Sequence, residues 1–598
     1  MKDFFKFMFA SMLGFLLTIG IATFIFFVTI SAIIASAEDT KEPKIASNTI
    51  LHIKFENAIQ DRPSNNPFEN IDFSTFEDKT PLSLKNILDN IEKAKVDDRI
   101  KGIYLDIPYL KANMATTEEI REALIDFKTS GKFIISYSEN YGQGEYYLAS
   151  VADEIYLNPA GEMNFKGYAA TLLFFKDALN RLDVDMQVIR HGKFKSAIEP
   201  FIRNDMSAEN RKQYEELIGS IWASRLEKIA GSRNLTVDKL NEIADSLTIR
   251  IAEDAKKNGL VDELLFEDEV KKRLVEKSEV ESEDELNFLA LKKFNKAKRK
   301  LKDGDDGDKE KWNSKNKVAL IYAEGEIVSG ESRDGSMGSE TIAKAIKEAR
   351  QDKKVKAIVL RVNSPGGSAL ASDVMWREVK LAKAEKPVVV SMGDVAASGG
   401  YYISCGANKI FAESSTITGS IGVFGLIPNM EGMLNNKLGI HTDRVTTNTY
   451  SDGLSSLRPL AKKERTALRE MIEHIYDEFT QKVADGRNMT QAEVDSIGQG
   501  RVWSGLSALK IGLVDEIGGL DNAILAAVEM AELEDYKLKE LPAREDPIQK
   551  MMSEFAAEAR MSIAGEAFGP AAKYYSNAKR VFESNGIYTR LPVDIIVE

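Results

Sequence analysis

The chain contains the stretch DKKVKAIVLRV at residues 352–362 and a second version of it, DDRIKGIYLDI, at residues 97–107, an offset of 255 positions (352 minus 97). The same offset relates ANKIFA at 407–412 to ADEIYL at 152–157. Further on, GLVDEI at 512–517 has a counterpart in GLVDEL at 259–264. Because self-similarity at a long fixed offset indicates a repeated structural unit, the sequence predicts a duplicated domain.

Each copy alternates two kinds of segment. In the later copy the order is VALIYAEGEI, ETIAKAIKEAR, KAIVLRV, MWREVKLAKAE and PVVVSM, in which short β-branched runs alternate with amphipathic stretches of helical period. This rhythm is typical of parallel strands joined by crossover helices, and continuous apolar runs fit strands that are buried on both faces. The sequence therefore predicts an α/β fold, in which ligands bind beyond the carboxyl ends of the strands.

Composition divides the chain further. A length of 598 residues exceeds what one core supports, and the KAKRKLKDGDDGDKEKWNSKNK segment has almost no apolar residues, as expected of an exposed linker. The expected units are an N-terminal tail at 1–6, a transmembrane anchor at 7–37, a first repeat at 47–295, a charged linker at 296–317, a second repeat at 318–545 and a helical C-terminal tail at 546–598.

The N-terminal segment at 7–37 carries no charged residue and is long enough to cross a bilayer, for which about 20 apolar residues suffice. A cleaved signal peptide is the alternative, with Ala35-Ser36-Ala37 as the cleavage site. The apolar stretch is about twice as long as the core of a signal peptide, which favours a retained anchor. Lysines flank it on both sides in equal number, so charge alone leaves its orientation undecided.

The charge and the metal-binding residue types exclude several classes of function. The net charge is -13, which argues against a nucleic-acid backbone as the main partner. The single cysteine, Cys405, excludes an intramolecular disulfide framework, and the four histidines show no metal-ligand spacing. We expect no metal and no cofactor.

Two glycine turns follow neighbouring predicted strands of the second repeat, SPGGS at 364–368 and GDVAASGGYYIS at 393–404. Ser398 in the second turn is a candidate nucleophile, and the N–H groups of Gly367 and Gly399 are candidate donors to an oxyanion. Glycine is also common in turns for steric reasons, and such turns can hold a phosphate or a thioester. The turns alone leave these alternatives open.

The repeat points to a base for Ser398. Its equivalent in the first copy is Gln143, and Lys111 and Ala112 stand in place of the SPGGS glycines. The first copy instead contains RHGKFKSAIEPF at 190–201, in which Lys195 lies opposite Tyr450 of the second copy. Each half therefore has what the other lacks.

A lysine acts as a base near neutral pH only if its pKa is lowered by burial or by nearby positive charge. Lys195 is followed by the apolar Ala197 and Ile198, which permits burial, and Lys193 is the alternative base. A single lysine is more often a solvated surface amine, so the assignment of Lys195 depends on the asymmetry of the repeats.

The motifs KFKSAIEPF, SPGGS, DVAASGGYY and TGSIGVFG (418–425) resemble those of the signal peptide peptidase A (protease IV) family in its long, duplicated form, and the resemblance covers nearly the whole chain. It implies tandem Clp protease/crotonase-like domains, a Ser/Lys dyad of Ser398 and Lys195, and a role for Ser420 in orienting the lysine. It also implies a single-pass protein of the bacterial inner membrane with a cytoplasmic N-terminus and a periplasmic catalytic part, a homo-oligomer (a tetramer), and hydrophobic signal peptide remnants as substrates.

Two other functions are compatible with parts of this pattern. Crotonase-like acyl-CoA enzymes use paired backbone donors to stabilise an enolate and would not need Ser398. A non-catalytic membrane scaffold would need neither Ser398 nor Lys195. For the peptidase, covalent linkage of the two halves favours a dyad formed within one chain.

Overall fold

The computed structural model describes residues 45–64, 80–297, 314–333 and 335–544. It also describes residue 43, short strands at 71–72, 77–78 and 586–590, and helical residues at 3–4, 6–15 and 17–21. In these parts of the chain no helix is both long and apolar enough to span a bilayer. Residues 22–37 of the expected anchor and 298–313 of the expected linker lie outside the described residues.

The first repeat forms a parallel sheet in the order β10-β8-β7-β6-β1-β11. The strands in the middle of the sheet consist mostly of apolar residues, because helices cover both faces of the sheet. The strands are β1 (Thr49–Lys54), β6 (Ile100–Asp106), β7 (Phe133–Tyr141), β8 (Glu154–Met163), β10 (Glu263–Leu264) and β11 (Asn287–Ala290). The helices are α2 (Leu84–Val96), α3 (Met114–Lys128), α4 (Gln143–Ala149), α5 (Lys176–Arg181), α6 (Glu199–Ile202), α7 (Ala208–Arg233), α8 (Val237–Asp245), α9 (Ala252–Lys257), α10 (Glu267–Ser278) and α11 (Leu291–Phe294).

The second repeat builds an equivalent sheet in the order β21-β19-β17-β15-β12-β23, with β18 pairing both β17 and β22. The strands are β12 (Lys317–Glu324), β15 (Val355–Ser364), β17 (Val388–Ala397), β18 (Lys409–Ala412), β19 (Ile417–Gly419), β21 (Val502–Ser504), β22 (Glu516–Ile517) and β23 (Lys537–Leu541). The helices are α13 (Ser339–Gln351), α14 (Ala369–Lys383), α15 (Gly399–Ser404), α16 (Lys462–Arg487), α17 (Gln491–Ile497), α18 (Gly505–Lys510) and α19 (Leu520–Met530).

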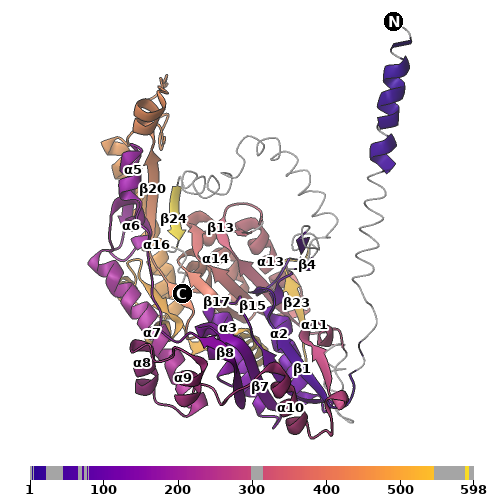
Figure 1. Ribbon diagram of the computed structural model, residues 1–598. Coiled ribbons are helices and arrows are strands. Elements are labelled where there is room, and N and C mark those ends of the chain that lie inside the picture. The colour runs from indigo at the N-terminus through magenta and orange to yellow at the C-terminus, as the bar shows by residue number, and fades with distance from the viewer. Residues whose placement is uncertain are drawn as a thin grey trace.

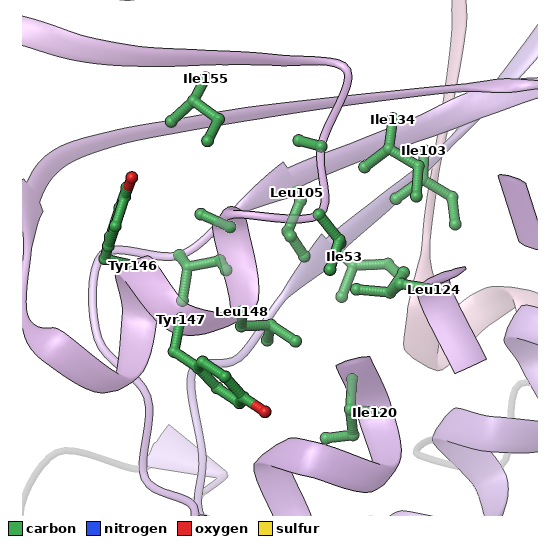
Figure 2. Packing of buried hydrophobic residues seen from close by; sticks show 14 of the residues in the cluster. Ile53, Ile103, Leu105, Ile120, Leu124, Ile134, Tyr146, Tyr147, Leu148 and Ile155 are labelled. Carbon is green, nitrogen blue, oxygen red and sulfur yellow. The ribbon is translucent and has the colours of Figure 1, made fainter. Parts of the chain in front are cut away.

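The packing inside each repeat follows from the sequence periods. In Figure 2, strand residues such as Ile103 and Ile134 face the helix residues Ile120 and Leu124, and all four side chains are fully buried. Burying one such side chain stabilises the fold by about 1.5–3 kcal/mol. The two-residue period of the strands and the 3.6-residue period of the helices both direct these side chains into a shared layer.

A third sheet contains strands from both repeats, in the order β14-β13-β16-β24-β20-β9. β9 (Asp185–His191) of the first repeat pairs antiparallel with β20 (Val423–Asn429) of the second along its whole length. This pairing carries the residues that follow β9 into the second repeat. The other strands are β13 (Glu326–Val328), β14 (Ser336–Gly338), β16 (Gly366–Ser368) and β24 (Gly586–Arg590), and β24 lies beside β20 in Figure 1.

A buried arginine joins the two repeats. Arg361 on β15 donates from Nε to Asp61 at 2.9 Å and from Nη2 to Glu119 of α3 at 2.5 Å. All three side chains are almost completely inaccessible to solvent. Burial raises the pKa of Glu119 to about 7, and the guanidinium opposes this shift.

Each repeat also caps a helix of the other. Asp394 on β17 accepts hydrogen bonds from the N–H groups of Ala115 and Thr116 in the first turn of α3, at 2.9 and 3.1 Å. In return, Glu119 accepts from the N–H of Leu520, the first residue of α19, at 2.6 Å. These carboxylates satisfy donors that a helix leaves without partners, and they fix the repeats to each other.

The C-terminal tail differs from the expectation in one place. The sequence predicts a helical tail at 546–598, whereas residues 586–590 form the strand β24. The pairing of β24 with two neighbouring strands supplies backbone hydrogen bonds that a local helical pattern does not reveal. The rest of the predicted tail lies outside the described residues.

Candidate active site

Ser398 lies between the end of β17 and the start of α15, as the strand–turn–helix pattern predicts. Its φ and ψ are 54° and -112°, a conformation that residues with a side chain rarely adopt. The turn is held by a 2.8 Å hydrogen bond from the Ser398 N–H to the carbonyl of Gly419. A Cβ at Gly400 would lie 2.8 Å from the Ser364 carbonyl oxygen, so the turn also requires glycine there. The serine side chain is fully buried.

Lys195 of the first repeat meets Ser398 of the second within one chain. It follows β9 and precedes a short 3-10 helix (Ser196–Ile198), and the pairing of β9 with β20 brings it beside β17 and β19. Its Nζ lies 2.8 Å from Ser398 Oγ, which is hydrogen-bond distance. The separation of 203 residues in sequence is thus closed by the contact between the repeats.

Burial lowers the pKa of Lys195 well below its usual 10.5, because the side chain is fully removed from solvent. Desolvation, rather than a nearby positive charge, is the cause of this shift. Lys193, the alternative base, is exposed, and its ammonium group lies against the ring of Phe194.

Ser420 lies beside the lysine, as its motif predicts. Its Oγ and its carbonyl oxygen lie 3.0 and 3.1 Å from Lys195 Nζ. Ser420 has a φ of 51°, and its N–H donates to the carbonyl of Arg501 at 2.7 Å. The amine of Lys195 therefore has three oxygen neighbours at fixed positions.

The two glycine turns lie at adjacent strand ends. Gly399 begins α15 directly after Ser398, so its N–H is one of those that the helix leaves without an internal partner. Gly367 pairs with Ile327 of β13 on one side and with Thr589 of β24 on the other. Its φ is 158°, and a Cβ there would lie 2.1 Å from the Ile327 carbonyl oxygen, so only glycine fits.

Comparison with known proteins decides the class of this site. The model of peptidase family S49 matches residues 126–281 and 380–534, once in each repeat. The chain belongs to peptidase family S49. The Clp protease family model also matches residues 308–418, which agrees with the predicted duplicated Clp-protease-like α/β fold.

Relatives of this S49 peptidase include Protease 4 of Haemophilus influenzae, 38% identical over 75% of this chain and 73% of the relative. Protease 4 of Salmonella typhi is 40% identical over 76% of this chain and 73% of the relative. A putative signal peptide peptidase of Enterococcus faecium is 37% identical over 32% of this chain and 55% of the relative. The chain is therefore a serine protease, which confirms the predicted enzyme class.

In the first repeat of the S49 peptidase, Gln143 occupies the position equivalent to Ser398, and its side chain is hydrogen-bonded to the backbone. Gln143 accepts hydrogen bonds from the N–H groups of Lys166 and Gly167 at 3.0 and 2.8 Å, and donates to the Gly167 carbonyl at 2.9 Å. Its side chain thus fixes the chain that follows β8. Lys195 of the first repeat instead contacts Ser398, at the site of the second repeat.

Sequence reasoning missed one segment of the peptidase site, at residues 498–501. The carbonyl of Gln499 accepts from the Phe194 N–H at 3.0 Å, and Gly500 contacts the backbone of Lys195. The signal was the GQG triplet at 498–500, which no predicted element explained. Its partner is some 300 positions away in sequence, so local pattern gave no reason to connect them.

Proposed function

We propose that Lys195 and Ser398 are the catalytic dyad of this S49 protease. The observation that carries the proposal is the 2.8 Å contact between Lys195 Nζ and Ser398 Oγ. Burial favours the neutral amine, which has a lone pair to accept the hydroxyl proton. Ser420 supports the assignment, because its two oxygens fix the amine without supplying a negative charge that would favour the ammonium form.

The reaction proceeds through an acyl-enzyme. Lys195 Nζ accepts the proton of Ser398, and Oγ forms a bond to the carbonyl carbon of the scissile peptide. The N–H groups of Gly367 and Gly399 donate to the resulting oxyanion. The protonated lysine then gives its proton to the leaving nitrogen as the C–N bond breaks. Neutral Lys195 next accepts a proton from water, whose oxygen attacks the ester carbon, and it returns that proton to Ser398 Oγ as the bond from the acyl carbon to Oγ breaks.

We propose that substrates bind as an extended strand between β16 and β20. β24 supports this, since its backbone pairs antiparallel with both strands and lies opposite Gly367. A peptide in the same place would present its backbone to the sheet and its alternate side chains to pockets, a common form of peptide recognition. A substrate must displace β24 to take this position.

The further proposal is that hydrophobic signal peptide remnants are the substrates, degraded on the periplasmic side of the inner membrane by an anchored oligomer, a tetramer. The uncharged segment at 7–37 supports the anchor, and the name of the Enterococcus relative supports the substrate class. An anchor would keep the active site near the bilayer, where such remnants are released.

The test uses purified full-length protein with a fluorogenic signal peptide and a polar peptide of equal length. Ser398→Ala and Lys195→Met should each lose at least about a hundredfold in kcat, the usual contribution of a general base. Lys193→Met, two residues from Lys195, is the matched control and should keep wild-type activity. Full activity in Lys195→Met would refute the dyad. Equal turnover of the two peptides would refute the substrate class alone.

A further inference from the structure

Three segments that are distant in sequence meet around Lys195, close to its backbone and the aliphatic part of its side chain (the lysine stem). They are residues 192–195 after β9, residues 420–422 between β19 and β20, and the 498–501 segment between α17 and β21. The 498–501 segment contacts both of the others. Its Gln499 carbonyl accepts from Phe194, its Gly500 N–H donates to Ile421 at 2.6 Å, and its Arg501 carbonyl accepts from Ser420.

Gly500 brings this segment into direct contact with the lysine. A Cβ at Gly500 would lie 2.5 Å from Lys195 Cβ and 2.6 Å from its Cα, so no side chain fits between the two backbones. Its φ of 83° also favours glycine. The position of the lysine stem therefore depends on the conformation of the 498–501 segment.

Tyr476 on α16 fixes that conformation. Tyr476 is 2% exposed, and its hydroxyl donates to Asp495 Oδ1 at 2.7 Å. The hydroxyl oxygen of Tyr476 in turn accepts the N–H of Gln499 at 3.1 Å. Gln499 has a φ of 52°, a strained value that persists only where surrounding contacts hold it. Burial raises the pKa of Tyr476, so the hydroxyl stays protonated and keeps its bond to Asp495.

Tyr476 also contacts the other side of the lysine. Its ring stacks on His191, with centroids 3.9 Å apart and an interplanar angle of 24°. His191 is the last residue of β9, four positions before Lys195. One side chain thus touches the strand that delivers the lysine and the segment that packs against its stem.

We propose that Tyr476, acting through Gln499 and Gly500, is a positioning residue that holds Lys195 Nζ at proton-transfer distance from Ser398 and away from water. The inference rests on the proposed dyad. Proton transfer over 2.8 Å is sensitive to displacement, and an error of about 1 Å in a reacting group can cost about a hundredfold in rate. Loosening the 498–501 segment would move the amine and admit solvent to it.

The deciding variant is Tyr476→Phe, which keeps the ring and the stacking on His191 but removes the hydroxyl. We expect kcat to fall about 10- to 100-fold with KM within about twofold of wild type. Because admitted water stabilises the ammonium, the acid limb of the kcat/KM profile should move to higher pH, toward the ordinary lysine value. Tyr146→Phe is the matched control, a buried tyrosine of the first repeat whose hydroxyl donates to Leu260 at 2.9 Å.

A second pair of variants guards against a folding defect in Tyr476→Phe. Asp495→Asn keeps an oxygen to accept from the tyrosine hydroxyl, and Asp495→Ala does not. Asp495→Ala should reproduce the loss in kcat and the shift of the pH profile, and Asp495→Asn should restore both. A wild-type pH profile and kcat in Tyr476→Phe, or in Asp495→Ala where Tyr476→Phe does not fold, would overturn the inference. An equal loss in Tyr146→Phe would do the same.

These outcomes differ from a failure of the dyad itself. If Lys195→Met and Ser398→Ala remain active, the proposed function fails and the positioning role fails with it. If both are inactive while the tyrosine and aspartate variants behave as wild type, the positioning role alone fails.

Discussion

Replacing Lys195 by methionine should make the protein more stable, by an amount that depends on pH. The buried amine is neutral in the folded protein above its lowered pKa, whereas in the unfolded chain it titrates near 10.5. Between these two values the unfolded state binds one more proton than the folded state, so wild-type stability rises with pH at about 1.36 kcal/mol per unit. Methionine has a similar length and no proton to bind, so Lys195→Met lacks this dependence.

The magnitude follows from the same relation. While the pH stays above the folded pKa, the cost of keeping the amine neutral is about 1.36 kcal/mol for each unit below 10.5. The stability difference between Lys195→Met and wild type should therefore grow at this rate as the pH falls from about 10, and level off at the folded pKa. The pH at which it levels off measures the pKa of the base.

Urea unfolding of wild type and Lys195→Met at a series of pH values measures the difference, with Lys193→Met as the control for a nearby exposed lysine. Lys193→Met should track wild type at every pH. A stability difference for Lys195→Met that stays constant from pH 7 to 10 would refute the reasoning, because it would mean that the amine is protonated in the folded protein throughout.

Three other predictions concern the active site and the contact between the two repeats. Ser398→Ala and Ser398→Gly should both be inactive. The free energy of unfolding in urea should be about 1–2 kcal/mol higher for Ser398→Gly than for Ser398→Ala, because a φ of 54° is strained for alanine, which has a Cβ, and not for glycine. Equal free energies of unfolding would contradict a strained turn. Arg361→Met leaves Asp61 and Glu119 buried without their cation and should lower the free energy of unfolding by about 3–5 kcal/mol. A loss below about 1 kcal/mol would show that the contact between the repeats does not depend on the guanidinium. Replacing residues 586–598 by a Gly/Ser segment of equal length should lower KM without lowering kcat, because β24 no longer competes with substrate; an unchanged KM in peptide turnover would show that substrate binds elsewhere.

The parts of the fold that sequence predicts are those with a local period. KAIVLRV and PVVVSM become β15 and β17 because continuous apolar runs suit strands covered on both faces. Comparison of the two repeats then relates residues that are far apart in sequence, which hydrophobic periodicity does not do. It placed Lys195 and Ser398 in complementary halves, and the structure brings the two side chains to 2.8 Å.

The rest depends on contacts that a local pattern does not encode. β16 is three residues long and β24 five, too short for a periodic signal, and β24 exists through its pairing with strands far away in sequence. Asp394 and Glu119 each cap a helix of the other repeat. The residues next to them in sequence therefore do not indicate which helix they cap. The GQG triplet was visible, but only the docked backbone of Lys195 explains Gly500.

The most direct test of the central claim is the rate at which a fluorophosphonate labels Ser398, followed by mass spectrometry from pH 5 to 10. A neutral Lys195 predicts labelling at Ser398 that falls as the pH drops through a value well below 10.5, is reduced at least about a hundredfold in Lys195→Met, and is unchanged in Lys193→Met. Labelling of Lys195→Met at the wild-type rate, or a label at a different serine, would contradict the claim that this buried lysine activates Ser398.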